Sequence, residues 1–311
     1  MRSRKVTTQD SVLHVVEDGD PRNPGILFLH GFPDCHAVWS HQLAALASDF
    51  HVITFDLRGV AESTAPSRKD GYRIERILPD IEAVIDATRG PEGKVHLVGH
   101  DWGSVLGWSF VGEPRYAARV RSWTSMSGPH VGSMLEGAKR GLLGRDGKRR
   151  WETIAQILSS WYVYALNIPG YGEKFFELVG ANGWRRALER GGVPSSDPYL
   201  RITDADVLAR TRNPIGLYQQ NLRPPPAPLA KGSVRTPTLL VVPLRDRFVK
   251  PVNFADLGEV CTKLERVEIE ANHWAQRSHP EVITALVRDF VSRNEGRTTE
   301  AGAARREGGV T

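Results

Sequence analysis

Short apolar runs recur along the first half of the chain and return near its end. GILFLH and VHLVGH are largely apolar, which is typical of strands buried on both faces of a parallel sheet. Segments with a helical pattern separate these runs, and this alternation predicts a mostly parallel sheet with helices on both faces. The predicted strands are Ser11–Glu17, Gly25–His30, His51–Asp56, Val95–His100, Val120–Ser125, Thr238–Pro243 and Arg266–Glu270, and the predicted helices are Ala37–Ala47, Ile74–Arg89, Ser104–Val111 and Pro280–Arg293.

Residues 128–234 break this alternation. They contain Gly- and Pro-rich turns, several Trp and Tyr residues and helical patterns with no buried strand between them, and the Pro-rich segment LRPPPAPL leads back to the next strand. We therefore predict a helical cap at 128–234, inserted into a core made of residues 1–127 and 235–293. Residues 294–311 are rich in Gly, Ala, Arg and Glu, a composition that predicts a disordered tail.

The composition changes this picture little. The 311 residues carry a formal charge of +5, and 40% of them are hydrophobic, as in ordinary globular enzymes. Because no basic stripe is interleaved with aromatic residues, nucleic acid is not an expected partner. Cys35 and Cys261 have no metal-ligand spacing and are expected to be reduced thiols. The chain shows no signal-peptide pattern and no apolar run long enough to span a bilayer, so we expect a cytoplasmic protein.

The most basic segment is Lys139–Arg150 (KRGLLGRDGKRR), at the start of the predicted cap. A run of this kind is in most proteins a solvated loop. The alternative is attraction to an acidic substrate or to anionic membrane lipids, which would give a weak peripheral membrane contact.

The candidate chemistry centres on Asp101, in the segment VGHDWGS. A buried strand runs into a Gly-x-x-x-Gly turn and a helix follows at once, which is the pattern of a nucleophile elbow. Ser usually occupies this position, whereas a carboxylate is ionised at neutral pH and attacks a carbon that bears a leaving group, forming an ester of the enzyme. Asp101 therefore argues against an esterase, lipase or peptidase. For Asp101 taken alone, a helix N-cap is the alternative.

Other turns supply partners for this carboxylate. The turn HGFP follows the strand GILFLH, where the backbone N–H of Phe32, with that of Trp102 after the nucleophile, is expected to form an oxyanion hole. Asp246 follows the strand TLLVVP, and His273 follows the strand RVEIE. Nucleophile, acid and base in this chain order at strand ends match the hydrolase pattern, although each residue alone could be an ordinary turn residue.

With the motifs HGFPD, DLRG, GHDWGS, RDRFV and NHW, the chain resembles the epoxide hydrolases of the α/β-hydrolase superfamily. It is most similar to the hydrolase half of bacterial proteins that fuse such a domain to a short-chain dehydrogenase, over about Val12–Val291, with no dehydrogenase half present. The resemblance implies an α/β-hydrolase fold, with an eight-stranded sheet and an inserted helical cap. It also implies substrate contacts from His30, Pro33 and Trp274. Ala61 stands where the family commonly has Gly, and we expect only a small loop change there.

The resemblance further implies two cap tyrosines that hydrogen-bond and protonate the epoxide oxygen. Tyr218, in PIGLYQQN, falls at the second position; Tyr162, in WYVYALNIPG, falls at the first, with Tyr164 as the alternative. Haloalkane dehalogenases share the motifs around the nucleophile but hold the halide with Trp or Asn donors, so the tyrosine pair favours an epoxide. The alternative for both tyrosines is packing of the cap against the core.

The resulting hypothesis is an enzyme that converts an apolar epoxide, for instance a lipid-derived one, to a vicinal diol through an ester on Asp101. His273, oriented by Asp246, then activates the hydrolytic water. No metal or organic cofactor is implied. The alternatives are a haloalkane dehalogenase that uses the same aspartate, an epoxide cyclase, and a homologue that binds a ligand without hydrolysing it. The sequence identifies neither the substrate's stereochemistry nor an oligomeric state.

Overall fold

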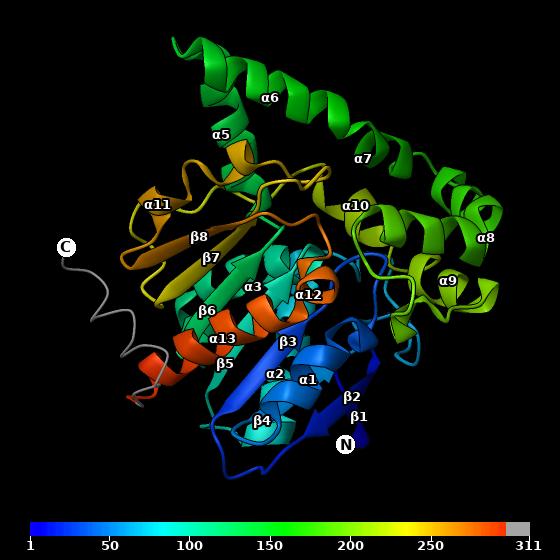
Figure 1. Ribbon diagram of the computed structural model, residues 1–311, viewed down its shortest axis with the longest axis vertical. Helices are drawn as coiled ribbons and strands as arrows, with labels where there is room; N and C mark the ends of the chain where they lie inside the picture. The colour runs from blue at the N-terminus through cyan, green and yellow to red at the C-terminus, as the bar shows by residue number, and fades with distance from the viewer. Residues whose placement is uncertain (297–311) are drawn as a thin grey trace.

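The computed structural model describes residues 1–296. Within them the chain forms one eight-stranded sheet (Figure 1) with the strand order β1-β2-β4-β3-β5-β6-β7-β8. The strands are β1 (Arg2–Thr7), β2 (Val12–Asp18), β3 (Gly25–Leu29), β4 (His51–Phe55), β5 (Val95–His100), β6 (Val120–Met126), β7 (Thr238–Pro243) and β8 (Leu264–Ile269).

The sheet is mostly parallel. β2 pairs antiparallel with both β1 and β4, and every following pair from β4–β3 to β7–β8 is parallel. The central strands β3, β4, β5 and β7 are buried at every residue, as expected where helices cover both faces. Because β3, β5, β7 and β8 are mutually parallel, the loops that follow them meet at one edge of the sheet.

Helices cover both faces of the sheet (Figure 1). α1 and α13 pack together on one face, and α2 and α3 on the other. On α13 the side chains of Ile283, Val287 and Phe290 are buried, and this spacing of four and three residues gives the helix one apolar face. The helices outside the insertion are η1 (His36–Trp39, a 3-10 helix), α1 (Ser40–Leu46), α2 (Ile74–Arg89), α3 (Trp102–Gly112), α4 (Pro114–Ala117), η3 (Pro251–Phe254, 3-10), α11 (Leu257–Val260), α12 (Ala275–Ser278) and α13 (Pro280–Asn294).

Between β6 and β7, a stretch that the structure describes throughout, the chain forms helices and no strand. These inserted helices lie along one side of the molecule, at the top and right of Figure 1. They are α5 (Val131–Leu143), α6 (Gly147–Ser159), α7 (Trp161–Leu166), α8 (Tyr171–Arg190), η2 (Pro198–Leu200, 3-10), α9 (Asp204–Thr211) and α10 (Gly216–Asn221). None of the helices in the described part of the chain combines the length and the apolar character needed to cross a membrane.

The predicted architecture is confirmed, with local corrections. The predicted helix Ala37–Ala47 is wrong at its start, where the 3-10 helix η1 precedes α1. The edge strand β1 was not predicted because its side chains, except that of Val6, are exposed and it has no apolar run. The predicted tail 294–311 is wrong at its beginning, because Asn294 ends α13; residues 297–311 lie outside the described part of the chain.

Candidate active site

Asp101 occupies the sharp turn between β5 and α3. Its φ is 51° and its ψ is −122°, a backbone conformation that residues with side chains rarely adopt. The turn also requires glycines, because a Cβ on Gly31 would lie 2.4 Å from Cβ of Asp101, and one on Gly103 would lie 2.3 Å from the carbonyl oxygen of Leu29. The predicted elbow is therefore present, with Asp101 at the end of β5.

The two predicted oxyanion-hole groups meet at the Asp101 carboxylate. The backbone N–H of Phe32 donates a hydrogen bond of 2.7 Å to Oδ1 of Asp101. Burial raises the pKa of Asp101 to about 6, although the charge of His273 and the backbone N–H groups of Phe32 and Trp102 act in the opposite direction. The carboxylate is therefore poorly solvated and held by backbone donors, a combination that suits a nucleophile.

His273 lies between two carboxylates. Its Nδ1 is 2.8 Å from Oδ2 of Asp246, and its Nε2 is 3.7 Å from Oδ2 of Asp101. The other oxygen of Asp246 accepts hydrogen bonds from the backbone N–H groups of Phe248 and Val249, at 2.8 and 3.0 Å. Burial alone would lower the pKa of His273, but the charges of Asp246 and Asp101 outweigh it and raise that pKa to about 9. The two carboxylates therefore favour the protonated form of the imidazole.

Two tyrosines of the inserted helices lie near this carboxylate. The rings of Tyr162 on α7 and Tyr218 on α10 are 6.5 Å apart, and Tyr218 also packs edge-on against Trp102. Burial raises the pKa of both phenols, and the charge of Asp101 raises it further, so both keep their protons. Tyr164 is 59% exposed because positions two apart on a helix do not share a face. The structure therefore brings Tyr162 rather than Tyr164 to Tyr218.

Aromatic rings that the sequence analysis did not single out complete the surroundings. The ring of Phe248, in the loop after β7, lies 5.0 Å from that of His273 and 5.6 Å from that of Tyr162. Phe176 on α8 packs edge-on against Phe32 at 5.5 Å. The motif RDRFV contains Phe248 and could have indicated it. Phe176 belongs to no motif, and only the packing of α8 reveals it.

Both ring nitrogens of His30 bind backbone groups. Its Nδ1–H donates to the carbonyl of Gly31 at 2.8 Å, and its Nε2 accepts the backbone N–H of Leu57 at 2.9 Å. Burial lowers the pKa of His30, which fits this neutral tautomer. Because both ring nitrogens bind the backbone and the side chain is fully buried, His30 fixes the turn before Phe32. A substrate contact from His30 remains a prediction.

Pro33 and Trp274 flank the same site. The bond between Phe32 and Pro33 is a cis peptide bond, and Pro33 is buried. The indole of Trp274 packs edge-on against His273 at 4.9 Å, and its N–H donates to Asp34 at 3.1 Å. Substrate contacts from these two residues remain a prediction.

Asp34 is a buried carboxylate that the motif HGFPD contains but to which no role was assigned. Besides Trp274, the hydroxyl of Tyr199 donates to it at 2.6 Å. Burial raises the pKa of Asp34, which the bond from Tyr199 partly opposes. Since Tyr199 lies in η2, this contact joins the core to the inserted helices, a connection that no local sequence signal could reveal.

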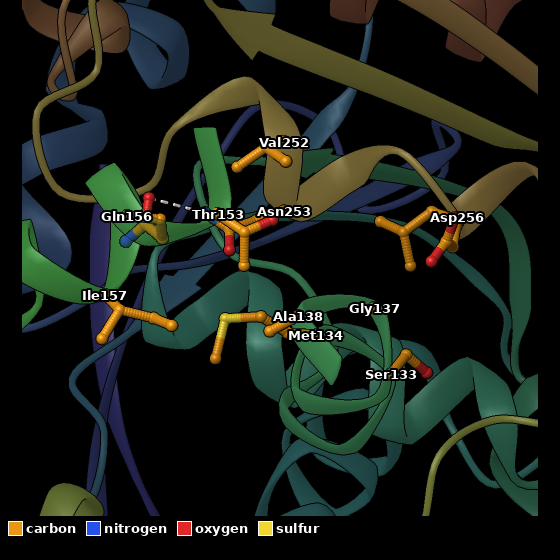
Figure 2. A pocket seen from close by; sticks show the side chains of 11 residues that line it. Ser133, Met134, Gly137, Ala138, Thr153, Gln156, Ile157, Val252, Asn253 and Asp256 are labelled. Carbon is orange, nitrogen blue, oxygen red and sulfur yellow. Dashed lines mark hydrogen bonds between the residues drawn. The ribbon is translucent and has the colours of Figure 1, made fainter. Parts of the chain in front are cut away.

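The loop that carries Asp246 is held by helix α6. The side-chain amide of Gln156 donates to the carbonyl of Phe248, and its oxygen accepts the backbone N–H of Lys250 and the side-chain amide of Asn253, each at 2.8 Å. Figure 2 shows Gln156 and its hydrogen bond to Asn253 at the edge of a cleft between α5, α6 and η3. The lining of this cleft includes none of the predicted site residues.

Within the described residues, one group of side chains has the composition of a metal site. Ligand atoms of His14, His36 and Asp56 lie within 4.8 Å of one another. Both carboxylate oxygens are already engaged, since Nδ1 of His14 lies 3.1 Å from Oδ2 of Asp56 and Nδ1 of His36 lies 2.9 Å from Oδ1. The prediction that the protein needs no metal is not tested by this group.

Comparison with known proteins places these features in a family. The sequence profile of the alpha/beta hydrolase fold family matches residues 24–280. A probable oxidoreductase, EphD, of Mycobacterium tuberculosis is 29% identical over 307 residues, 95% of this chain but 50% of that protein. Epoxide hydrolase 3 of Xenopus tropicalis and epoxide hydrolase 4 of Homo sapiens are each 28% identical, over 89% and 92% of this chain and 74% and 78% of their own lengths. The chain thus spans about half the length of the mycobacterial relative.

Solved structures show the same fold. The Bacillus megaterium epoxide hydrolase in complex with an inhibitor superposes with a TM-score of 0.74 at 22% identity, covering 93% of this chain and 100% of that one. Epoxide hydrolase VrEH1 from Vigna radiata superposes with a TM-score of 0.71 at 24% identity, covering 94% and 98%. The arrangement of the sheet and the inserted helices is therefore shared along nearly the whole chain.

Proposed function

Since the chain belongs to the α/β-hydrolase fold family, we propose that it is an epoxide hydrolase that forms a vicinal diol through an alkyl ester on Asp101. The observation that carries the proposal is the pair of protonated phenols, Tyr162 and Tyr218, beside a buried carboxylate at the elbow. The carboxylate supplies a nucleophile, and the phenols supply the proton that an alkoxide leaving group needs. Relatives named epoxide hydrolases support the same reaction.

In the first half-reaction, Oδ2 of Asp101 attacks one epoxide carbon and the bond between that carbon and the ring oxygen breaks. Oδ1 stays with the backbone N–H of Phe32, where it becomes the carbonyl oxygen of the ester. Tyr162 and Tyr218 donate hydrogen bonds to the ring oxygen, and one of them gives the alkoxide its proton. The tyrosinate then recovers a proton from solvent.

In the second half-reaction, His273 becomes a base. Ester formation removes the charge of Asp101, which is one of the charges that raise the pKa of His273. That pKa therefore falls, the imidazolium releases its Nε2 proton to solvent, and Nε2 of the neutral imidazole then takes a proton from a water that attacks the ester carbon. Asp246 holds the imidazole through Nδ1, and the N–H groups of Phe32 and Trp102 stabilise the oxyanion. The bond between the ester carbon and the alkyl oxygen then breaks, the departing alkoxide takes the proton that His273 accepted, and the diol leaves. The new carboxyl group passes its proton to Nε2 of His273, which restores the carboxylate of Asp101.

The inserted helices support a cap function. Residues 128–234 contribute Tyr162, Phe176 and Tyr218 to the surroundings of Asp101, and each packs on an aromatic ring of the site. We infer that this segment is a cap on a core of residues 1–127 and 235–293, and that the aromatic walls select an apolar epoxide.

The mycobacterial relative supports a second, narrower proposal. Because the match covers half of that protein, whose printed name is that of an oxidoreductase, we infer that the matched half is a hydrolase and that the rest carries the dehydrogenase chemistry. A cytoplasmic location for the present chain stays a prediction, and its two free cysteines are consistent with it.

The proposal is tested by turnover in ¹⁸O-labelled water. After many turnovers of an epoxide, the peptide that contains Asp101 should gain the mass of ¹⁸O in that carboxylate, because the hydrolytic oxygen enters the ester carbonyl. The Asp101→Ala variant, incubated identically, should neither turn over nor gain label. Diol formation without label in this peptide would contradict the covalent route.

Phenol variants separate the epoxide reaction from its rivals. Tyr162→Phe combined with Tyr218→Phe should abolish epoxide opening, because no donor then protonates the alkoxide, whereas Tyr164→Phe should leave the rate unchanged. A haloalkane dehalogenase would instead release halide and label Asp101 in all of these variants. A folded protein that binds epoxides without turnover or label would be a non-hydrolytic binder, and formation of a cyclic ether would indicate a cyclase.

A further inference from the structure

The inserted helices leave many apolar side chains in contact with solvent. Within the described residues, all but three of the exposed large hydrophobic side chains lie between residues 135 and 178. The exposed fraction is 68% for Trp151, 59% for Trp161 and 88% for Leu178. Isolated exposed apolar residues are ordinary, but a concentration of them in one region marks an interaction surface.

Eight of these side chains follow α6, α7 and α8, which succeed one another along the upper right margin of the molecule (Figure 1). Ile168 lies in the turn between α7 and α8, and the other seven lie on the helices. Within each helix these seven are three, four or seven positions apart, so that they share one face of that helix. We call this set the apolar ridge. Its members are Trp151, Leu158, Trp161, Tyr164, Ile168, Tyr171, Phe175 and Leu178.

A cluster of cations adjoins one end of the ridge, where α5 ends and α6 begins. Residues 139–150, which we call the basic end, contain six Lys or Arg residues and a single Asp. Some of these cations pair with carboxylates. Lys139, Arg145 and Arg150 are exposed and have no carboxylate partner within the part of the chain that the structure describes. The basic end therefore presents uncompensated positive charge beside the apolar ridge.

We propose that the apolar ridge and the basic end together dock on a membrane that contains anionic lipids. Apolar side chains enter the boundary of the acyl chains while cations meet the headgroups, as in amphipathic helices that lie in the membrane plane. Trp and Tyr, which make up half of the ridge, are the residues that favour this boundary. A protein partner would need an apolar groove and an acidic surface side by side, whereas an anionic bilayer offers both.

Helix α7 joins the docking surface to the candidate active site. It turns Trp161 and Tyr164 towards solvent and Tyr162 inwards, where the ring packs against Phe248 and Tyr218. An apolar epoxide dissolved in the bilayer would thus lie one helix away from the site. This consequence rests on the proposed function; the docking itself does not.

Docking is measured by co-sedimentation with vesicles of phosphatidylglycerol and phosphatidylcholine in equal amounts. The wild-type chain should bind these vesicles at low salt, and release at high salt should follow from screening of the headgroup charge. Trp151→Gln with Leu158→Gln should weaken binding by about ten- to a hundred-fold, from the apolar burial that is lost. Val282→Gln, a matched change of an exposed side chain on α13, should bind like wild type.

Charge variants test the basic end separately. Lys139→Gln and Arg145→Gln should each weaken binding to the anionic vesicles by about five-fold, and neither should matter on vesicles of phosphatidylcholine alone. Intrinsic fluorescence gives an independent signal, because the Trp residues other than Trp151 and Trp161 are buried. A blue shift on vesicles would therefore report insertion of these two side chains, and the double variant Trp151→Phe with Trp161→Phe should lose it.

The outcomes separate this inference from the proposed function. Turnover of a water-soluble epoxide should be unchanged in Trp151→Gln with Leu158→Gln, since neither side chain belongs to the site. A wild-type chain that hydrolyses the epoxide but does not bind the vesicles overturns docking and leaves the function standing. A wild-type chain that binds the vesicles but does not turn over the epoxide supports docking and contradicts the proposed function. A concentration-dependent dimer that the same variants dissociate, without vesicle binding, would show that the ridge joins two copies of the chain and would overturn docking.

Discussion

At the scale of single residues, the charges around Asp101 decide when the carboxylate can react. Burial disfavours its ionised form, while the imidazolium of His273 and two backbone N–H groups favour it. The balance leaves the pKa at about 6, so the proposed nucleophile is ionised at neutral pH but is protonated in mildly acidic solution.

This balance predicts the pH dependence of ester formation. Below pH 6 the rate, measured as kcat/KM or as single-turnover alkylation of Asp101, should fall by about tenfold per pH unit, because only the carboxylate attacks. The His273→Gln variant should still form the ester and accumulate it, since no base remains to activate water. Its profile should also move to higher pH, because the imidazolium that lowers the pKa of Asp101 is gone. A midpoint near that of an ordinary carboxyl, in either protein, would contradict a buried nucleophile.

The position of a residue could be predicted from sequence where its chemistry and its place in the chain coincide. Asp101, Asp246 and His273 each follow a recognisable strand, so their meeting point is set by the parallel sheet. Tyr162 and Tyr164 could not be separated in the same way, since only the packing of α7 decides which ring faces inwards. The hydrogen-bond partners of His30 could not be predicted either, because its place in the motif does not reveal that both ring nitrogens bind backbone groups.

At the scale of elements, helix α6 acts on the reaction through the loop after β7. The Gln156 amide holds the backbone at Phe248 and Lys250, and the same loop wraps two backbone N–H groups around Asp246. The side chain of Gln156 is therefore a positioning group for the carboxylate that orients His273.

Gln156→Leu should consequently slow the second half-reaction more than the first. Leaving a partly buried carbonyl and a partly buried N–H without partners costs about 1 kcal/mol each, and the loop relaxes at the expense of the bond between Asp246 and His273. We expect kcat to fall by about ten- to a hundred-fold, with accumulation of the ester on Asp101 in rapid-quench mass measurements. Thr153→Ala, which loses a hydrogen bond within α6 only, should accumulate no ester. Equal slowing of both half-reactions would reduce Gln156 to a general structural role.

Elements themselves were predictable to the extent that burial controls their pattern. β5, β7 and α2 have the predicted bounds, because buried strands form apolar runs and because Gly90, whose φ is +83°, directly follows the last residue of α2. β1 was not predicted because this exposed edge strand forms by backbone pairing with β2, and its mostly exposed side chains show no pattern typical of a buried strand. The order of the inserted helices could not be derived either, because their mutual packing depends on contacts between residues far apart in sequence.

At the scale of the whole molecule, a buried ion pair fastens the inserted helices to the core. Arg277 on α12 is fully buried and binds Asp197, the residue that precedes η2, through two hydrogen bonds. The guanidinium also stacks on the ring of Tyr199 and donates to the hydroxyl of Ser40 at 2.6 Å. The inserted helices thus contact the core through this ion pair, close to the hydrogen bond between Tyr199 and Asp34.

Removing one charged partner of this ion pair should destabilise the protein strongly. Asp197→Asn leaves the Arg277 cation buried without a counter-ion, which costs about 3–5 kcal/mol, whereas Asp49→Asn, which breaks the more exposed pair with Arg288, should cost less than about 1 kcal/mol. Urea unfolding at neutral pH measures both. Burial alone would raise the pKa of Asp197, but Arg277 and the backbone N–H of Tyr199 lower it overall, so the stabilisation is present above the ordinary carboxyl pKa and disappears as the pH falls below it. The free energies of unfolding of the two variants should therefore become similar in strongly acidic solution. An equal loss of unfolding free energy in both variants at neutral pH would show that the ion pair between Arg277 and Asp197 does not hold the inserted helices on the core.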